Sequence, residues 1–241
     1  MGEKNLVDPL GQAALDYLNG KRNLKITVQS NIVEDDVLPV DYLFRSFAEM
    51  PPLEQKALLH CRGSVLDVGG GVGSHTLELK QRGHAVTLLD TSRGCCQVAQ
   101  QRGLINVINE DFYQLPADRK YDTLLLMMNG IGIVAAIDHL PVFFAKARAL
   151  LNTNGQILLD SSDLRYLYID EDSYCAPDEE QYYGEVMYTM QYGKHKTPAF
   201  EWLFIDPVLL TRVARENGFA CEVLAEGDHY DYLARLTLIE K

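Results

Sequence analysis

Short apolar runs alternate with segments of helical periodicity through the middle of the chain. The runs "SVLDV" and "HAVTLLD" have the length and composition of buried strands. The segments "SHTLELKQRG" and "TSRGCCQVAQQRG" follow them and have the pattern of helices that end at Gly83 and Gly103. This alternation predicts an α/β domain built on a doubly wound, mostly parallel sheet.

The same alternation continues to residue 160 and returns at the end of the chain. A weaker strand in "INVINEDFYQLP" precedes a run from Leu124 to Met128 that is apolar on both faces, as central parallel strands are. We expect next a helix capped by Asp138 and a strand from Gln156 to Leu159. After residue 205 we expect a helix that begins at Pro207, followed by two strands joined around Gly227 to Tyr230.

Two segments fall outside this pattern. Residues 1–63 predict an amphipathic helix and a second helix around "PVDYLFRSF", entered through Pro39. Residues 161–205 hold seven of the thirteen tyrosines and nine acidic residues against three Lys or Arg. Their stretch "EVMYTMQYGKHKTPAFEWLFID" predicts two strands joined by a turn near Gly193 to Pro198.

Composition narrows the classes of function. A chain of 241 residues with 47% hydrophobic content can bury the core of one main domain. Its formal net charge of -12 would repel phosphate backbones and anionic lipid headgroups, which argues against nucleic-acid and membrane partners. The N-terminal stretch lacks the basic start and apolar core of a signal peptide, so we expect a soluble, cytoplasmic protein. The five cysteines form no C-x-x-C pair, and we expect reduced thiols and no bound metal.

A glycine-rich turn separates the first predicted strand of this pattern from its helix. The stretch "VLDVGGGVGSHTLEL" contains four glycines: Gly69, Gly70, Gly71 and Gly73. Glycine removes the side chain that would keep a ligand away from the main chain, so a ligand is expected against this turn, unless the glycines serve strand-helix packing alone. A dinucleotide fingerprint, G-x-G-x-x-G, would need a glycine at Ser74, whereas the pattern D-x-G-x-G-x-G is complete from Asp67.

This pattern resembles the first motif of the class I S-adenosylmethionine-dependent methyltransferases. The resemblance covers residues 64–160 and implies a Rossmann-like methyltransferase fold, in which a C-terminal antiparallel hairpin strand completes a seven-stranded sheet. It implies that residues 64–160 bind S-adenosylmethionine and that residues 206–241 complete this core. In the family, additions such as the helical extension at 1–63 and the β-rich insertion at 161–205 commonly cover the site and select the acceptor.

The resemblance also implies which strand-end residues bind the cofactor. Asp90, with Thr91 beside it, lies about twenty residues past the glycines, where an acid accepts hydrogen bonds from both ribose hydroxyls. Asp111 would meet the adenine amino group and Phe112 the adenine ring, although a loop acid and a core aromatic residue give the same pattern. Asn129 is a candidate for lining the cofactor or acceptor. Its run "NGIG" lacks the prolines and aromatic residue of the N-P-P-Y run in DNA amino-group methyltransferases.

The predicted function is transfer of a methyl group, by in-line displacement, to a small-molecule acceptor. The acidic, tyrosine-rich insertion at residues 161–205, if it covers the site, favours a neutral or cationic acceptor. The alternative is that its tyrosines are half-buried sheet residues and its acidic runs lie in solvated loops. Arg45 is our candidate for pairing with the cofactor's carboxylate, the alternative being a surface arginine on an amphipathic helix. Two other functions remain open: a non-catalytic S-adenosylmethionine-binding regulatory domain and a nicotinamide-dependent oxidoreductase.

A general base is needed only if the acceptor loses a proton during transfer. The sequence offers several candidates near strand ends or in the cover and does not distinguish among them: His139, His195, His229, Asp160, Asp163 and Tyr230. Each of these side chains could equally satisfy local hydrogen bonds. The sequence therefore assigns no catalytic residue.

Overall fold

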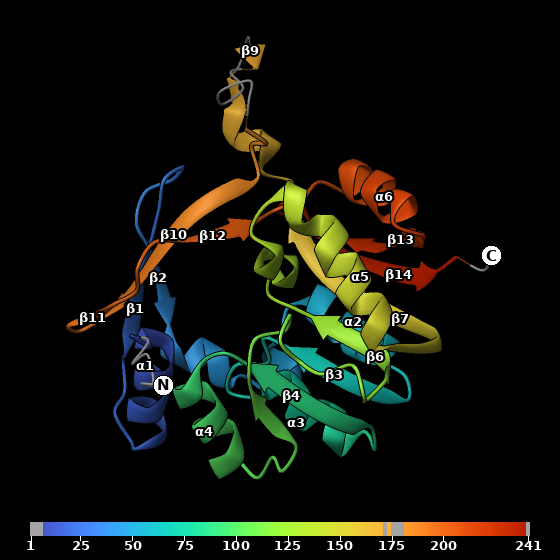
Figure 1. The fold of residues 1–241 in the computed structure, drawn as a ribbon. Helices are drawn as coiled ribbons and strands as arrows, with labels where there is room; N and C mark the ends of the chain where they lie inside the picture. The colour runs from blue at the N-terminus through green and yellow to red at the C-terminus, as the bar shows by residue number, and fades with distance from the viewer. Residues whose placement is uncertain (1–6, 171–172, 175–180, 240–241) are drawn as a thin grey trace.

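The computed structural model describes residues 7–170, 173–174 and 181–239, and a seven-stranded sheet forms its centre. The strand order is β13-β14-β7-β6-β3-β4-β5 (Figure 1). Strands β3 to β7 run parallel, while β14 is antiparallel to both β7 and β13. The expected doubly wound sheet with its C-terminal hairpin is confirmed. Its strands are β3 (Ser64–Val68), β4 (Ala85–Asp90), β5 (Val107–Asn109), β6 (Tyr121–Leu126), β7 (Leu151–Ser162), β13 (Phe219–Glu226) and β14 (Asp231–Leu238).

Helices cover both faces of this sheet. Leu124 and Leu125 of β6 are fully buried and point to opposite faces, because successive side chains alternate along a strand. Leu124 shares a core with Phe143 and Leu125 shares one with Leu58. A central strand with helices on both sides must be apolar throughout, as this one is. The first face carries α5 (Leu140–Leu150) and α6 (Pro207–Glu216), and the second carries α2 (Pro52–His60), α3 (Ser74–Gln81) and α4 (Arg93–Gln101).

A second sheet stands beside the first and joins the two segments that lie outside the core pattern. Its path is β11-β10-β1-β2, with β12 also paired to β10, and all its pairings are antiparallel. In Figure 1 the arrows of β4 and β6 point toward the side on which β1 and β10 stand. The carboxyl ends of the parallel strands therefore face this second sheet. Its strands are β1 (Lys25–Ser30), β2 (Asp36–Pro39), β10 (Glu185–Tyr192), β11 (His195–Lys196) and β12 (Phe200–Leu203).

The N-terminal segment is less helical than the sequence suggests. The first predicted helix is present as α1 (Pro9–Leu18), which Asp8 caps through the backbone amide of Gly11. The second is only a 3₁₀ helix, η1 (Val40–Phe44), because the backbone returns to an extended conformation at Arg45. Strands β1 and β2, which the sequence analysis did not anticipate, lie between α1 and η1.

Predicted boundaries and one predicted number of strands also differ from the structure. Strand β7 (Leu151–Ser162) extends beyond the predicted strand Gln156–Leu159 at both ends. The residue at the N-cap of α5 is His139, the last residue of the 3₁₀ turn η4 (Ile137–His139), and Asp138 lies one position earlier. Strand β6 ends at Leu126 rather than Met128, since Met128 has a positive φ that no strand allows. The segment from residue 185 to 205 contains three strands rather than two.

The second sheet is anchored on the loop that follows β6. Trp202 of β12 packs against η3 (Gly130–Val134), where a β-carbon on Gly132 would lie 2.0 Å from the indole ring. Glu185 of β10 accepts a hydrogen bond of 2.8 Å from the amide of Ile137. These contacts hold the second sheet next to the strand ends. No helix among the described residues is both long and apolar enough to cross a membrane.

Candidate cofactor and acceptor site

The glycine turn presents open space along its main chain. Gly69 and Gly71 have φ angles of +70° and +54°, and a β-carbon added to either would meet no atom within 4 Å. Gly70 and Gly73 differ, since a β-carbon at Gly70 would crowd Leu88 and Asp67 and one at Gly73 would crowd Leu104. Two glycines therefore allow close packing inside the protein, and the other two leave an accessible backbone.

Asp90, at the end of β4, closes this turn. Its Oδ2 accepts a hydrogen bond from the Gly71 amide at 2.8 Å, and its Oδ1 accepts one from the Ser92 amide at 2.7 Å. A carboxylate has about four acceptor positions, so capacity for two more donors remains. Burial raises the pKa of Asp90 to about 6, assisted by the charges of Asp8 and Asp67, while the two amides oppose the rise.

Asp67, the first residue of the glycine pattern, lies beneath the turn. It is only 1% exposed and accepts a 2.5 Å hydrogen bond from the Thr76 hydroxyl of α3. Burial, its largest influence, raises the pKa of this carboxyl. The structure therefore places Asp67 where it joins the turn to α3, while the accessible backbone belongs to Gly69 and Gly71.

The residues just after β5 are a loop acid and a core aromatic residue, which is the alternative that the sequence had left open. Asp111 is exposed, and its side chain accepts a hydrogen bond from the Tyr113 amide at 2.7 Å. Phe112 is 5% exposed and packs in the core against Phe143, with 5.7 Å between the ring centroids. Thr91 is exposed, and its carbonyl accepts a hydrogen bond from Asn109. Asp111 and Thr91 are accessible to a ligand, whereas the Phe112 ring is a core side chain.

The backbone is strained where β6 ends. Met128 and Asn129 have φ angles of +65° and +56°, a conformation that costs non-glycine residues energy and is concentrated at functional sites. The next amide, that of Gly130, donates to Oδ1 of Asp160 at 3.2 Å. The Asn129 side chain accepts a hydrogen bond of 2.9 Å from the Ser162 hydroxyl. Asn129 and Asp160 are thus neighbours at the ends of adjacent strands.

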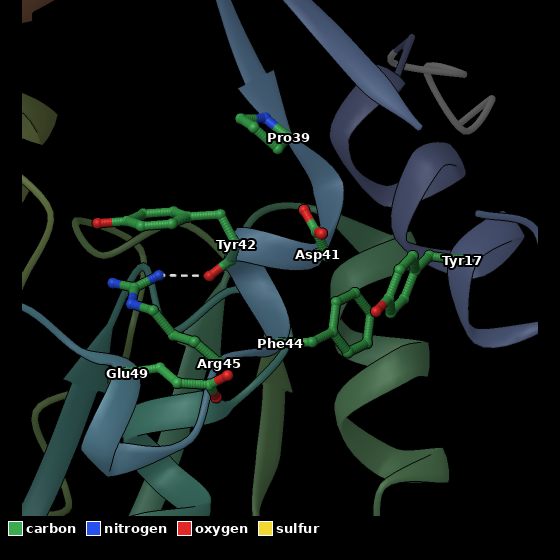
Figure 2. A pocket seen from close by; sticks show the side chains of 7 residues that line it. All are labelled: Tyr17, Pro39, Asp41, Tyr42, Phe44, Arg45 and Glu49. Carbon is green, nitrogen blue, oxygen red and sulfur yellow. Dashed lines mark hydrogen bonds between the residues drawn. The ribbon is translucent and has the colours of Figure 1, made fainter. Parts of the chain in front are cut away.

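Arg45 is an interior residue and not the surface arginine of the alternative interpretation. It is 7% exposed, and its Nη2 lies 2.5 Å from both carboxylate oxygens of Glu54. Its Nη1 donates to the Tyr42 carbonyl, and its guanidinium lies 3.9 Å from the centre of the Tyr42 ring (Figure 2). Its Nε is buried, and this one donor of the cation has no hydrogen-bond partner among the described residues.

Glu54 joins Arg45 to the helix after the glycine turn. His75 of α3 lies 2.6 Å from Glu54 through its Nε2. Burial opposes the charged imidazole, but the hydrogen bond to Glu54 and the nearby Asp67 carboxylate raise the pKa of His75. For Glu54 the two cations outweigh its burial and lower the pKa. Sequence reasoning missed Glu54 and His75, because nothing local distinguishes them from surface helix residues.

A pocket of about 520 Å³ opens along η1, beside Arg45. Figure 2 shows the Tyr42 ring above the guanidinium of Arg45, with Phe44 directed toward Tyr17 of α1. The carbonyl of Leu43 accepts a 2.7 Å hydrogen bond from Ser74, the first residue of α3, so η1 is fixed next to the glycine turn. The pocket is lined by Tyr17, Pro39, Asp41, Tyr42, Phe44, Arg45 and Glu49.

The four described cysteines are not among the residues of this site. Cys61, Cys95 and Cys96 are buried free thiols and Cys221 is partly buried, whereas Cys175 lies outside the described residues. Burial raises the pKa of the Cys95 thiol, which keeps it protonated. In the part of the chain that the structure describes, no three His, Cys, Asp or Glu side chains are placed to hold a metal ion.

Comparison with known proteins identifies the family. A family model described as a methyltransferase domain matches residues 65–155. The chain also superposes on a SAM-dependent methyltransferase from Bacteroides fragilis, crystallised with S-adenosyl-L-homocysteine, with a TM-score of 0.91 and 40% sequence identity over 97% of this chain and 96% of that one. The chain belongs to the S-adenosylmethionine-dependent methyltransferases. A comparison with curated proteins found no match.

More distant structures share the methyltransferase fold alone. The sugar N-methyltransferase KedS8 from Streptoalloteichus is 15% identical, with a TM-score of 0.58 over 88% of this chain and 98% of that one. The amino pentose methyltransferase CalS10 from Micromonospora echinaspora is 12% identical, with a TM-score of 0.57 over 82% of this chain and 95% of that one.

The match to the Bacteroides fragilis protein and the family model identify the chain as an enzyme that uses S-adenosylmethionine. Neither the regulatory-domain nor the nicotinamide alternative is retained.

The residues of this methyltransferase fit its cofactor. The open backbone at Gly69 and Gly71 leaves room for a ligand, and Asp90 keeps free acceptor positions next to it. The unpartnered Nε of Arg45 is a buried donor of the kind that a carboxylate satisfies. S-adenosylmethionine supplies a methyl group that its sulfonium already activates, so the protein has mainly to position the acceptor and exclude water.

Most residues considered as general bases are dispersed. His195 lies in the edge strand β11, and His139 at the start of α5 is within hydrogen-bonding distance of the Val134 carbonyl. Asp163 accepts a hydrogen bond from Tyr183, and the exposed Tyr230 stacks on Tyr166 with 4.7 Å between ring centroids. His229 lies in the turn between β13 and β14, where its amide donates to Asp231. Of the candidates, Asp160 alone bonds to the strained end of β6.

The affinity for S-adenosylhomocysteine is expected to fall about tenfold between pH 7.5 and pH 5. We expect the ribose hydroxyls to bind the ionised carboxylate of Asp90, whose pKa is about 6 in the free protein, so acidification through pH 6 would remove an acceptor. The affinity therefore rises with pH and levels off above about pH 7. Isothermal titration calorimetry at several pH values measures the profile.

Asp90→Asn is the control for this profile. The variant is expected to bind more weakly at neutral pH and to lose most of the pH dependence, because an amide does not titrate in this range. A profile with the same slope in parent and variant would assign the titration to another group.

Proposed function

We propose that this methyltransferase acts on a small molecule, neutral or cationic, that binds between the strand ends and the second sheet. The observation that carries the proposal is the set of tyrosines and carboxylates on this side. Burial is the main cause of the raised pKa of Tyr42, which the charge of Arg45 opposes and the charges of Glu54 and Asp160 increase. Burial and the charge of Asp36 raise the pKa of Tyr188. Aromatic faces with nearby carboxylates favour cations and polar neutral molecules over anions.

The placement of the second sheet supports an acceptor of limited size. Trp202 and Glu185 hold this sheet against the loop after β6. An acceptor has to fit between this sheet and the strand ends, whereas a duplex or a folded protein needs a wide, open face. The net charge of -12 further disfavours a nucleic-acid substrate. KedS8 and CalS10, which share the fold, are named for sugar and amino pentose methyl transfer.

In this proposal the cofactor is bound by residues from several separate parts of the chain. Asp90 accepts from the ribose hydroxyls and Asp111 from the adenine amino group, while Gly69 and Gly71 let the ligand approach the main chain. The Nε–H group of Arg45 donates a hydrogen bond to the carboxylate of the cofactor, and Asn129 lines the space between cofactor and acceptor. The second sheet excludes water and holds the acceptor for in-line attack on the methyl carbon.

The test is a screen with methyl-labelled S-adenosylmethionine. Pools of small amines, neutral polyols and aminosugars, carboxylic acids, tRNA and unfolded protein are incubated with the enzyme, and labelled products are separated by mass. We expect labelled product from the cationic or neutral small-molecule pools. Label that appears only on nucleic acid, on protein or on carboxylic acids would contradict the proposal. The Gly71→Val variant, which should not bind the cofactor, measures the label that is incorporated without enzyme activity.

A further inference from the structure

Asp160 occupies a distinctive position at the carboxyl edge of the central sheet. It lies near the end of β7, next to the end of β6, and is partly exposed. The amides of Asn129 and Gly130 both act as donors to its carboxylate, the latter at 3.2 Å from Oδ1. Two amides leave about half of the acceptor positions of this carboxylate unused. It therefore retains capacity to bind a further donor.

The local backbone is strained in a way that directs these amides at Asp160. Met128 and Asn129 both adopt left-handed conformations, and neither is a glycine. Ser162, two residues beyond Asp160 on β7, holds the Asn129 side chain through its hydroxyl. Strain of this kind persists only when surrounding contacts impose it, and it is concentrated at active sites. The strained backbone at Met128 and Asn129 thus fixes the Asp160 carboxylate at the carboxyl edge of the sheet, where doubly wound sheets bind their ligands.

The surroundings of Asp160 bring its pKa close to neutral pH, where it is mostly ionised and able to take up a proton. Burial is the main influence and raises its pKa to about 6, and the charge of Glu54 adds to the rise. The amides of Asn129 and Gly130 and the charge of His75 act in the opposite direction. The charge of Asp160 also reaches Tyr42 of η1, where it contributes to the raised pKa of the tyrosine. A pKa near the working pH is what proton transfer to a base requires.

We propose that Asp160 is the catalytic base, accepting a hydrogen bond from an amine or hydroxyl of the acceptor and then its proton. This inference rests on the proposed small-molecule acceptor and narrows it to nitrogen or oxygen nucleophiles. The acceptor's lone pair forms the bond to the methyl carbon, the carbon-sulfur bond breaks with its electron pair passing to sulfur, and the proton of the acceptor goes to Asp160. No other reactant is needed for balance.

The test uses sinefungin, the cofactor analogue in which a carbon bearing an ammonium group replaces the sulfur bearing the methyl group. Its ammonium occupies the position at which acceptor and methyl meet, so Asp160 should bind it as it binds the acceptor's donor. We expect the Asp160→Asn variant to lose sinefungin affinity by tenfold or more and S-adenosylhomocysteine affinity by less than twofold in calorimetry. Asp163→Asn, three residues further along, is the matched control and should change neither affinity.

A second measurement needs no variant. In the parent protein, the ratio of the two affinities should favour sinefungin increasingly as the pH rises through 6, because only an ionised Asp160 attracts the ammonium. Any effect of Asp90 on ribose binding is common to both ligands and cancels in the ratio. An affinity ratio that is the same at pH 5 and pH 7.5, or unchanged in Asp160→Asn, would overturn the inference. Failure of the acceptor screen alone would instead contradict the proposed acceptor class.

Discussion

Replacing Gly71 with valine is expected to weaken the binding of S-adenosylmethionine and S-adenosylhomocysteine on the order of 100-fold or more. The added side chain would project into the open space beside the turn, where nothing in the protein lies within 4 Å. The φ of +54° also strains any β-carbon, which costs ~1–2 kcal/mol of stability. Calorimetric titration with both ligands and a thermal melt measure the two effects separately.

Gly83→Val is the matched control for this variant. Gly83 also has a positive φ, +88°, and open space around its α-carbon, but it lies just beyond the C-terminal end of α3. The control should lose a similar amount of stability and keep full affinity for the cofactor. If both variants bind equally well, or both lose binding to the same degree, the glycine turn is not the ligand cradle.

Replacing Arg45 with methionine is expected to destabilise the protein by ~3–5 kcal/mol, because Glu54 then remains buried with only His75 to pair with. Both members of the Arg45 and Glu54 pair have side chains that are only 5% exposed. Urea unfolding followed by circular dichroism gives the free energy of unfolding. Addition of Glu54→Gln to this variant should restore part of the loss, since it removes the unpaired charge.

Arg82→Met supplies the comparison for a surface pair. Arg82 lies 2.7 Å from Glu78 one turn earlier on α3, and its side chain is 30% exposed. Such pairs contribute about 0.3–0.5 kcal/mol, so this variant should unfold almost as the parent does. Equal losses for Arg45→Met and Arg82→Met would show that the interior pair stabilises the protein no more than a surface pair does.

The central sheet could be predicted because its signals are local. The apolar run of β6, the helix that ends before Gly83 and the acid at the end of β4 each depend on a few neighbouring residues. The position of Asp90 beside the glycine turn follows from the parallel pairing of β3 and β4, in which equivalent strand ends meet at one edge. This part of the site therefore followed from the order of elements.

The rest of the site depends on contacts between distant segments. Nothing near Arg45 in the chain shows that it will be buried against Glu54 and His75, because the burial is created when η1 and α2 pack against α3. The left-handed conformation of Met128 goes against its intrinsic preference and is imposed by its surroundings. The Phe112 ring likewise turns into the core, which the sequence had left open.

The pairing of β1 with β10 has a consequence for the synthesis of the chain. Gln29 and Thr189 are neighbours in this pairing, yet 160 residues separate them. During translation β1 can pair with β2 soon after both leave the ribosome, but its other edge must wait until β10 has been made. Closure of so long a loop is slow, so this sheet is expected to form last, after the central sheet has brought its two halves together. Until then β1 exposes an unpaired edge to other nascent chains, and a chain that stops short of β10 keeps that edge open permanently.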